Sequence, residues 1–341
     1  MQVALVGVSG YSGMVLYNLL KAHPAVEQVH LYGRQNTAPQ PLSGVAPMFQ
    51  KEAAVIRPFD ATAVMQTNDC IFFATSAGVT KSLALPLIAA HFPVIDLSGD
   101  FRLRQPEQYQ RWYHQPAAPL SALQAASYGL ADLAQPLTTY VANPGCYATA
   151  TLLGLAPLIQ GRLVDPTSII VDAKSGFSGA GKRLTANSHF VNGHDNLQLY
   201  KLNAHQHIPE IMQQLQAWWP AVPAIEFTTT LIPVTRGIMS TIYAKAAAPM
   251  TQAQLVTSFQ QTYQGEPFVQ ILEIGMPDLK LVVGSNNCAL GVNYNPVTNT
   301  VMVVSVIDNL LKGAAGQAVQ NFNRYFDLAL TAGLPTVPVF P

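Results

Sequence analysis

The stretch VALVGVSGYSGMVLYNLL, residues 3–20, decides the first half of the fold. A short apolar run is followed by three glycines and then by a helical pattern. In a nucleotide-binding turn, Gly7 permits the tight bend, Gly10 lets the backbone approach a pyrophosphate, and Gly13 lets the helix pack on the strand. Amides at the start of the helix would then hold the phosphates. The stretch predicts a dinucleotide-binding loop, with a purely structural strand–helix turn as the alternative. The candidate cofactor-binding residues of this loop are Gly7, Ser9, Gly10, Tyr11, Ser12 and Gly13.

The sequence on either side of the loop alternates between strand and helix patterns. Strand-like runs are expected at 3–7, 29–33, 70–75 and 94–98, with helices at 13–22 and 79–90. Such alternation indicates a doubly wound parallel sheet of the α/β class. The all-apolar run CIFFA fits a sheet that is covered on both faces.

The pattern changes after about residue 165. Runs such as SIIVDA and TVMVVSVI are strand-like, with fewer helices between them. They indicate a larger, mostly antiparallel or mixed sheet. The chain ends in a helical pattern near 310–330 and a proline-rich tail. We therefore expect two domains that share a close interface, with a ligand-binding cleft between them.

Composition limits the possible partners. The chain has 341 residues with 18 basic and 18 acidic side chains, so its zero net charge argues against a nucleic-acid or anionic-membrane partner. Only 11% of residues are charged, which suggests that part of the surface is hidden in an oligomer. No apolar run approaches the roughly 18 residues of a membrane span, and the N-terminus does not resemble a signal peptide. Three widely spaced cysteines make no disulfide framework, so we expect a reducing, cytoplasmic location.

The end of the second strand discriminates between nicotinamide cofactors. NAD sites usually place an acidic residue there to accept from the ribose 2′-hydroxyl. Here the sequence is VHLYGRQNT, which has no acid and places Arg34 where a 2′-phosphate could be met. Arg34 is either an NADP contact or a solvated surface arginine, and we favour NADP over NAD.

Cys146, in YVANPGCYATATLLG (140–154), has a setting that the other cysteines lack. Asn143 is a preferred N-cap and Pro144 suits the first helical position, which would place Cys146 among the free amides of the first turn. That position lowers a thiol pKa and can stabilise an oxyanion. The alternative is an inert buried thiol, which is the expectation for Cys70 and Cys288.

A possible partner for the thiol is the cluster LNAHQHIPEI, with His205, His207 and Glu210. One interpretation is a metal site, but no third strong ligand follows at a familiar spacing. A second is a polar loop capped by Pro209. The third is a histidine acid/base that is oriented by Glu210.

Nine motifs, in this order over nearly the whole chain, resemble those of the N-acetyl-γ-glutamyl-phosphate reductases, relatives of the aspartate-semialdehyde dehydrogenases. The motifs are GVSGYSG, DLSGDFRL, SYGLADL, ANPGCYATA, SGFSGAGK, HQHIPEI, LIPVTRGIMSTIY, GSNNCALG and DNLLKGAAGQAVQN. The resemblance implies a Rossmann NADP-binding domain of residues 1–145 plus 312–341. It also implies a catalytic and dimerisation α+β domain, 146–311, of the glyceraldehyde-3-phosphate dehydrogenase type. A homodimer or homotetramer acting on a small acyl-phosphate substrate, in arginine biosynthesis, is expected.

The resemblance also implies roles for single residues. Cys146 matches the nucleophile, and His205 matches the acid/base with Glu210 as its orienter, although the sequence leaves His207 open. Arg102 is expected to clamp phosphate, or else to form a structural ion pair, and Arg236 to touch the substrate. The remaining residues expected to border cofactor or substrate are Thr75, Ser175, Gly176 and Asn309.

Two positions depart from the family pattern. The loop ATSAG (74–78) stands where the family commonly has Pro and His, and Gly99 stands where it has Ala. Two other functions stay open: the same chemistry on an N-acetyl-aminoadipyl or aspartyl phosphate, and a non-catalytic NADP-sensing protein.

Overall fold

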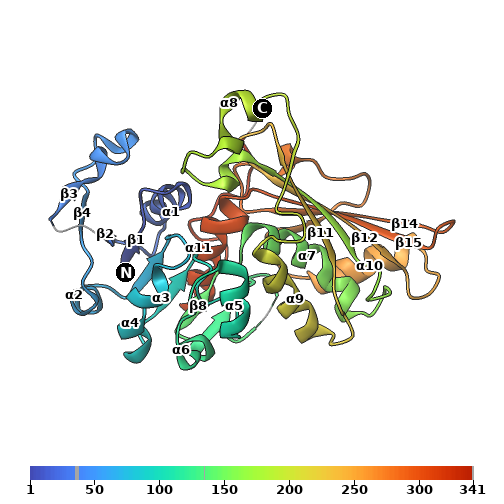
Figure 1. The fold of residues 1–341 in the computed structure, drawn as a ribbon, viewed down its shortest axis with the longest axis horizontal. Coiled ribbons are helices and arrows are strands. Elements are labelled where there is room, and N and C mark those ends of the chain that lie inside the picture. The colour runs from blue at the N-terminus through green and yellow to red at the C-terminus, as the bar shows by residue number, and fades with distance from the viewer. Residues whose placement is uncertain (35–37, 134, 340–341) are drawn as a thin grey trace. The chain divides into compact units, whose positions relative to one another are not determined.

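The computed structural model describes residues 1–34, 38–133 and 135–339 of the chain. Within these ranges the chain divides into two compact units, each built around its own sheet (Figure 1). The first unit holds Met1–Pro144 and Ala314–Leu334, and the second holds Gly145–Gly313 and the tail that begins at Pro335.

The described residues of the first unit form a sheet with the strand order β3-β4-β2-β1-β5-β6-β8-β7. Its pairs are parallel from β4 to β7, and β3 pairs antiparallel with β4. The strands are β1 (Gln2–Val6), β2 (Gln28–Gly33), β3 (Gln40–Pro41), β4 (Val55–Pro58), β5 (Cys70–Phe73), β6 (Val94–Asp96), β7 (Ala126–Tyr128) and β8 (Tyr140–Ala142). All four residues of β5 are buried, as expected for a sheet covered on both faces. The predicted doubly wound sheet is confirmed.

The helices of this unit cover the sheet. They are α1 (Tyr11–Ala22), α2 (Ala61–Thr67), α3 (Thr80–Leu83), α4 (Leu85–Ala89), α5 (Pro106–Tyr113), α6 (Leu120–Ala125) and α11 (Gly316–Tyr325), with short turns η1 (Leu42–Gly44) and η2 (Pro47–Phe49). The helix expected over 79–90 is two helices, because Pro86 has no amide to continue the hydrogen-bond ladder of the first. Although α11 comes from the end of the chain, it lies beside α1 (Figure 1).

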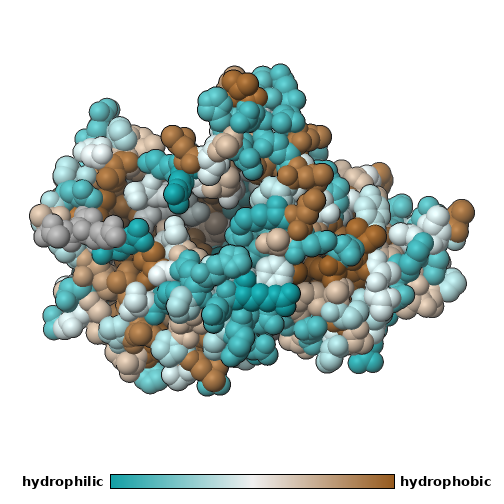
Figure 2. Space-filling view, in the orientation of Figure 1, coloured by the Kyte–Doolittle hydropathy of each residue, from teal (hydrophilic) through white to brown (hydrophobic). Residues whose placement is uncertain are grey.

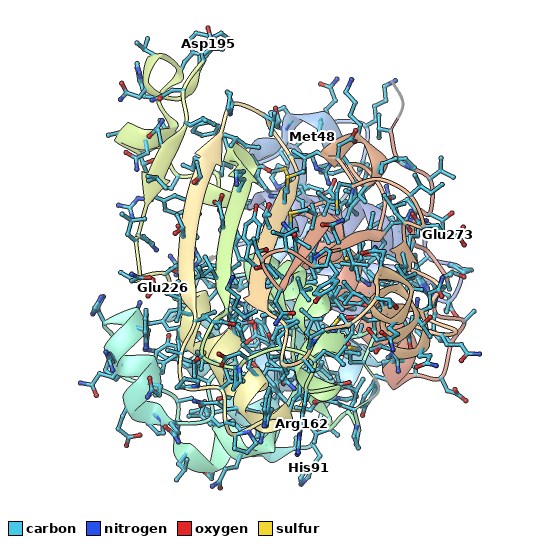
Figure 3. The ribbon with its side chains drawn as sticks, turned by 90° about the vertical axis from the view of Figure 1, so that its right-hand side faces the viewer. Met48, His91, Arg162, Asp195, Glu226 and Glu273 are labelled. Atoms are coloured by element: carbon cyan, nitrogen blue, oxygen red, sulfur yellow. The ribbon has the colours of Figure 1, made fainter. Side chains whose placement is uncertain are left out.

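The described residues of the second unit form a mixed sheet with the order β10-β11-β9-β12-β15-β14-β13. Its strands are β9 (Ile170–Gly176), β10 (Gln198–Tyr200), β11 (Glu226–Ile232), β12 (Ile238–Lys245), β13 (Val269–Ile271), β14 (Cys288–Asn295) and β15 (Thr300–Ile307). Figure 3 shows strands of this sheet side by side, with Glu226 at the start of β11 and Asp195 at the outer end of the segment around α8. The mixed sheet confirms the expected α+β domain.

The remaining elements of the second unit pack on or extend from this sheet. They are α7 (Cys146–Gln160), α8 (Phe190–Gly193), α9 (His207–Trp218), α10 (Gln252–Thr262), the short turns η3 (Phe177–Ala180), η4 (Ala186–Ser188) and η5 (Leu279–Leu281), and the π-helical segment η6 (Leu311–Ala315), which continues into α11. Helix α7 is buried along almost its whole length and packs on β12 and β15. This burial is expected, because the sequence of the helix is apolar on all sides.

The C-terminal tail differs from the expected assignment. The resemblance implies that 335–341 belong to the first domain, but residues 335–339 join the second unit, and 340–341 lie outside the described residues. The amide of Asn286 donates to the carbonyl of Pro335, and the amide of Val339 donates to the carbonyl of Val283. These backbone hydrogen bonds hold the described part of the tail on the second unit. Among the helices of the described ranges, none combines the length and apolar character needed to cross a membrane.

Candidate active site

The first part of the site is a pocket above the carboxyl ends of β1 and β2. It is lined by Val6, Gly7, Val8, Ser9, Gly10, Tyr32, Gly33, Arg34, Gln40, Val45, Ile56, Ala74, Thr75, Ser76 and Val79. Of the predicted cofactor residues, the pocket brings together Gly7, Ser9, Gly10, Arg34 and Thr75. Tyr11, Ser12 and Gly13 follow as the first residues of α1. The sequence did not predict four of the lining residues, namely Tyr32, Gln40, Val45 and Ile56. Of these four, Tyr32 could have been predicted from its position at the end of the expected second strand.

Two glycines of this loop, Gly7 and Gly13, have the steric roles that the sequence predicted. Gly7 has φ +96°, and a Cβ there would collide with the carbonyl of Ala74. A Cβ on Gly13 would collide with the carbonyl of Gly7, so the helix can approach the strand only without a side chain. A Cβ on Gly10 would lie at an ordinary contact distance, 3.7 Å, from the carbonyl oxygen of Gly7, so packing within the loop does not by itself require glycine at this lining position. The lining residues therefore fit a dinucleotide, whose phosphates need bare backbone at this turn.

The second part of the site is the start of α7. The helix begins at Cys146, and Gly145 is its N-cap with extended backbone angles. Cys146 thus lies in the first turn, as predicted, but as its first residue: the prediction of Asn143 as the cap and Pro144 as the first helical residue was wrong. The side chain of Asn143 lies in the first unit, where it donates to the carbonyl of Ala314 and accepts from Asn321. These partners lie more than 170 residues away in the sequence, which is why a local pattern could not reveal them.

Glycines allow other groups to approach Cys146 closely. A Cβ on Gly313, in the π-helical segment, would lie 2.7 Å from the Cβ of Cys146. A Cβ on Gly145 would collide with Nε2 of His207. The imidazole of His207 therefore lies against the peptide that precedes Cys146. π-Helical turns of this kind are frequent at functional sites.

Glu210 also contacts the start of α7. Its buried carboxylate Oε1 accepts from the amide of Gly145 at 2.8 Å. The expected role of Glu210 was to orient His205, whose Nδ1 accepts from the backbone amide of His207 at 3.2 Å. The two side chains are thus held by different amides.

His205 lies in an aromatic environment. Its ring centroid lies 5.1 Å from that of Tyr147, 5.9 Å from that of Tyr200 and 4.7 Å from that of His207. Burial, followed by the nearby charges of His207 and Lys201, lowers the pKa of His205 to about 2. His205 is therefore a neutral imidazole at physiological pH.

This neutral histidine predicts a pH-dependent stability. Below about pH 6.5 the unfolded chain binds a proton that folded His205 does not, so the free energy of unfolding falls as the pH decreases. His205→Asn keeps an acceptor for the His207 amide but removes this titration. The stability difference between wild type and variant should shrink by about 2 kcal/mol between pH 7.5 and 5.0 in urea unfolding. A difference that is constant with pH would contradict the buried neutral state.

The two predicted anion-binding arginines are each tied to neighbouring groups. Arg102 is buried in the first unit, where its Nε donates to the carbonyl of Asn143 at 2.9 Å and its Nη2 to that of Leu97 at 2.7 Å. Arg236, in the second unit, donates to the buried carboxylate of Asp308 at 3.0 Å. Its side chain keeps 29% exposure, so solvent and small anions can reach it.

The remaining predicted residues form a network in the second unit. Oδ1 of Asn309 accepts from the amide of Gly237 at 2.7 Å, and its Nδ2 donates to Ser178. The hydroxyl of Ser175 donates to the carbonyl of Gly176. Asn309 thereby holds the turn that follows Arg236. Within the described ranges, no group of three or more His, Cys, Asp and Glu side chains is arranged to hold a metal ion.

Known proteins define the class to which this fold and site belong. The family model described as "Semialdehyde dehydrogenase, NAD binding domain" matches residues 2–139, and "Semialdehyde dehydrogenase, dimerisation domain" matches 146–309. The fold is similar to that of aspartate semialdehyde dehydrogenase II from Vibrio cholerae, with a TM-score of 0.70, 16% identity and coverage of 96% of this chain and 98% of that chain. The class is that of the semialdehyde dehydrogenases, with a nicotinamide-binding domain.

Closer relatives narrow the class. A protein of Lactiplantibacillus plantarum named N-acetyl-gamma-glutamyl-phosphate reductase 2 is 72% identical over the full length of both chains. A protein of Limosilactobacillus fermentum named N-acetyl-gamma-glutamyl-phosphate reductase is 54% identical, also over the full length of both chains. The chain belongs to the N-acetyl-γ-glutamyl-phosphate reductase family, which confirms the resemblance seen in the sequence motifs.

Proposed function

We propose that this protein reduces N-acetyl-γ-glutamyl phosphate to N-acetylglutamate semialdehyde, with release of phosphate, through a thioester on Cys146. The observation that carries the proposal is the position of Cys146 as the first residue of α7, with the imidazole of His207 against the preceding peptide. The positive end of the helix favours a thiolate there, and amides of a first helical turn point toward the position where an oxyanion would form.

The chain's own residues account for the covalent steps. The Cys146 thiolate attacks the γ-carbonyl carbon, the acyl–oxygen bond to phosphate breaks, and inorganic phosphate leaves with the electron pair. When bound, the nicotinamide cofactor supplies the hydride that reduces the thioester carbon. As the resulting thiohemiacetal oxyanion collapses to the aldehyde, the carbon–sulfur bond breaks with its electron pair going to sulfur, and a proton from a histidine neutralises the departing thiolate.

We assign this proton transfer to His207, with His205 as its neutral neighbour. The ring of His207 lies against Gly145. In contrast, burial lowers the pKa of His205 to about 2, so its imidazole is neutral at neutral pH and lacks the second ring proton that an acid would donate. The carboxylate of Glu210 holds the Gly145 amide, which would keep the turn before Cys146 in place. For substrate anions, the half-exposed Arg236 is the stronger of the two arginine candidates, because Arg102 commits two donors to backbone carbonyls.

We propose NADP as the cofactor. Arg34 borders the pocket at the end of β2, and Gly33 precedes it where an acid would serve NAD. Arg34→Ala should raise the Kd of NADPH by about 10- to 100-fold, because it removes the proposed cationic partner of the 2′-phosphate. The Kd of NADH, which has no such phosphate, serves as the internal control in the same fluorescence titration. An equal loss for both cofactors would contradict the assignment.

We also propose that the protein is a homodimer or homotetramer. The matched domain model is a dimerisation domain, and the segment around α8 exposes hydrophobic side chains (Figure 2). These are Leu184, Phe190, Val191, Leu197, Leu199 and Leu202. Exposed apolar groups of this number are typical of an interaction surface. A monomeric mass in sedimentation equilibrium would contradict the proposal.

The substrate assignment is tested by phosphate-dependent reduction of NADP⁺. N-Acetylglutamate semialdehyde should be oxidised faster than the N-acetyl-aminoadipate and aspartate semialdehydes at equal concentrations. Faster oxidation of either analogue would contradict the proposed substrate and assign that analogue instead. NADPH binding without any turnover would favour the NADP-sensing alternative.

A further inference from the structure

A fully buried carboxylate lies behind the loop that borders the cofactor pocket. Oδ1 of Asp100 accepts from the amide of Gly78 and from the hydroxyl of Tyr109, both at 2.6 Å. Its Oδ2 accepts from the amide of Lys81 at 3.0 Å. Asp100 thus joins the loop of residues 74–81 to α5 through three hydrogen bonds.

This loop shapes the pocket. Ala74, Thr75, Ser76 and Val79 line it, together with Gly7, Ser9 and Gly10 of the glycine turn. The carbonyl of Ala74 occupies the space that a Cβ on Gly7 would need, so the loop and the phosphate-binding turn are packed without a gap. A shift of the loop therefore changes the backbone surface that meets a dinucleotide.

Side chains of Tyr113, at the end of α5, and of Gln115, two residues further on, occupy the space that side chains at Gly99 and Gly78 would need. A Cβ on Gly99 would collide with the ring of Tyr113, and a Cβ on Gly78 would collide with the side-chain amide of Gln115. Tyr113 stacks on Tyr109 at 4.6 Å between ring centroids with an interplanar angle of 11°. Gly99, one of the two departures from the family pattern, thereby makes room for this stack.

The same region contains the other departure, the loop ATSAG (74–78), where the family commonly has a Pro and a His. Proline would have limited the loop's backbone freedom by itself. In this chain the loop relies on contacts instead: the Asp100 carboxylate, the amide of Gln115, and a 2.6 Å hydrogen bond between the hydroxyls of Thr75 and Thr80.

We propose that Asp100, supported by the stacked Tyr109 and Tyr113, is a positioning residue for the nicotinamide cofactor. It fixes the loop 74–81 against the glycine turn, so that the pocket is formed before the cofactor binds. Affinity is then gained because less conformational freedom is lost on binding. The inference rests on the proposed function, in that the pocket must bind NADPH.

Asp100→Asn tests the role with little change in shape. The new amide nitrogen would face either the Lys81 amide or the Gly78 amide, placing two donors against each other. We expect the Kd of NADPH to rise by about tenfold or more in a fluorescence titration of the full-length protein. The alkylation rate of Cys146 in the cofactor-free protein should stay within about twofold of wild type, which a general structural defect would not allow.

The matched control is Asp60→Asn. Asp60 lies in the same unit and also holds a backbone amide, that of Ala63 at 2.7 Å, but it does not line the pocket. Asparagine keeps a side-chain oxygen that can accept from this amide, so the variant makes the same Asp-to-Asn change away from the pocket and should bind NADPH as wild type does. Tyr109→Phe, which removes one hydrogen bond to Asp100, should raise the Kd of NADPH by about three- to tenfold and serves if Asp100→Asn does not fold.

Two negative results have different meanings. Wild-type affinity for NADPH in folded Asp100→Asn or Tyr109→Phe would overturn the positioning role while leaving the proposed function intact. A wild-type protein that fails to bind NADPH would overturn the proposed function itself.

Discussion

Cys146→Ala is expected to lower kcat by about four orders of magnitude or more, because the proposed mechanism passes through an acyl group on its sulfur. The Kd of NADPH should stay within about twofold of wild type, since the pocket for the cofactor is built from the first unit. The measurement is steady-state turnover beside a fluorescence titration of the same sample. Residual turnover within about tenfold of wild type would remove Cys146 from the chemistry.

The matched control for this variant is Cys288→Ser. Cys288 is buried in β14, and its Sγ lies 3.6 Å from the hydroxyl of Ser305, so a serine there keeps a hydrogen-bonding partner. Turnover should remain near that of wild type. Cys70 also lies in a strand, where burial raises the pKa of its thiol. In rapid alkylation, the modified cysteine should be Cys146.

His207→Asn is expected to give the second-largest loss, about 10²- to 10⁴-fold in kcat, because it removes the proposed acid beside the nucleophile. His205→Asn should lower kcat by less than about tenfold, since its acceptor for the His207 amide is preserved. The two substituted histidines lie only two positions apart in the sequence, so each variant is a control for the other.

The pH profile separates proton transfer from a loss of structure. If His207 transfers the proton, the His207→Asn variant should lose one ionisation from the kcat profile, whereas the His205→Asn variant keeps it. If instead the His205→Asn variant shows the large loss of kcat and the missing ionisation, the proton transfer belongs to His205, the residue that the sequence motif favoured.

The first domain was predictable because its determinants are local. Gly7 has a φ of +96° that favours glycine, Gly13 meets the carbonyl of Gly7 in the same loop, and the alternation of strands with helices follows from hydrophobic patterning. The break between α3 and α4 could also have been predicted, since Pro86 lies inside the expected helix. The placement of the tail could not, because it depends on hydrogen bonds to residues 283 and 286, about 50 positions earlier.

The site was predictable in its residue types but not in its contacts. The sequence placed Cys146 in the first turn of α7, yet the cap is Gly145 because Asn143 is held by Ala314 and Asn321. The spacing of His205 and His207 puts both near one place but does not tell which ring meets Gly145. That distinction comes from a close approach of side chain to backbone, which no sequence pattern encodes.

The most direct test is a single-turnover experiment with N-acetyl-γ-glutamyl phosphate and no NADPH. We predict a burst of about one phosphate per active site and an N-acetylglutamyl group on Cys146, identified by mass spectrometry of the acid-quenched protein. Cys146→Ala should show neither. A phosphate burst with the acyl group on another residue, or turnover with NADPH but no burst without it, would contradict the thioester mechanism.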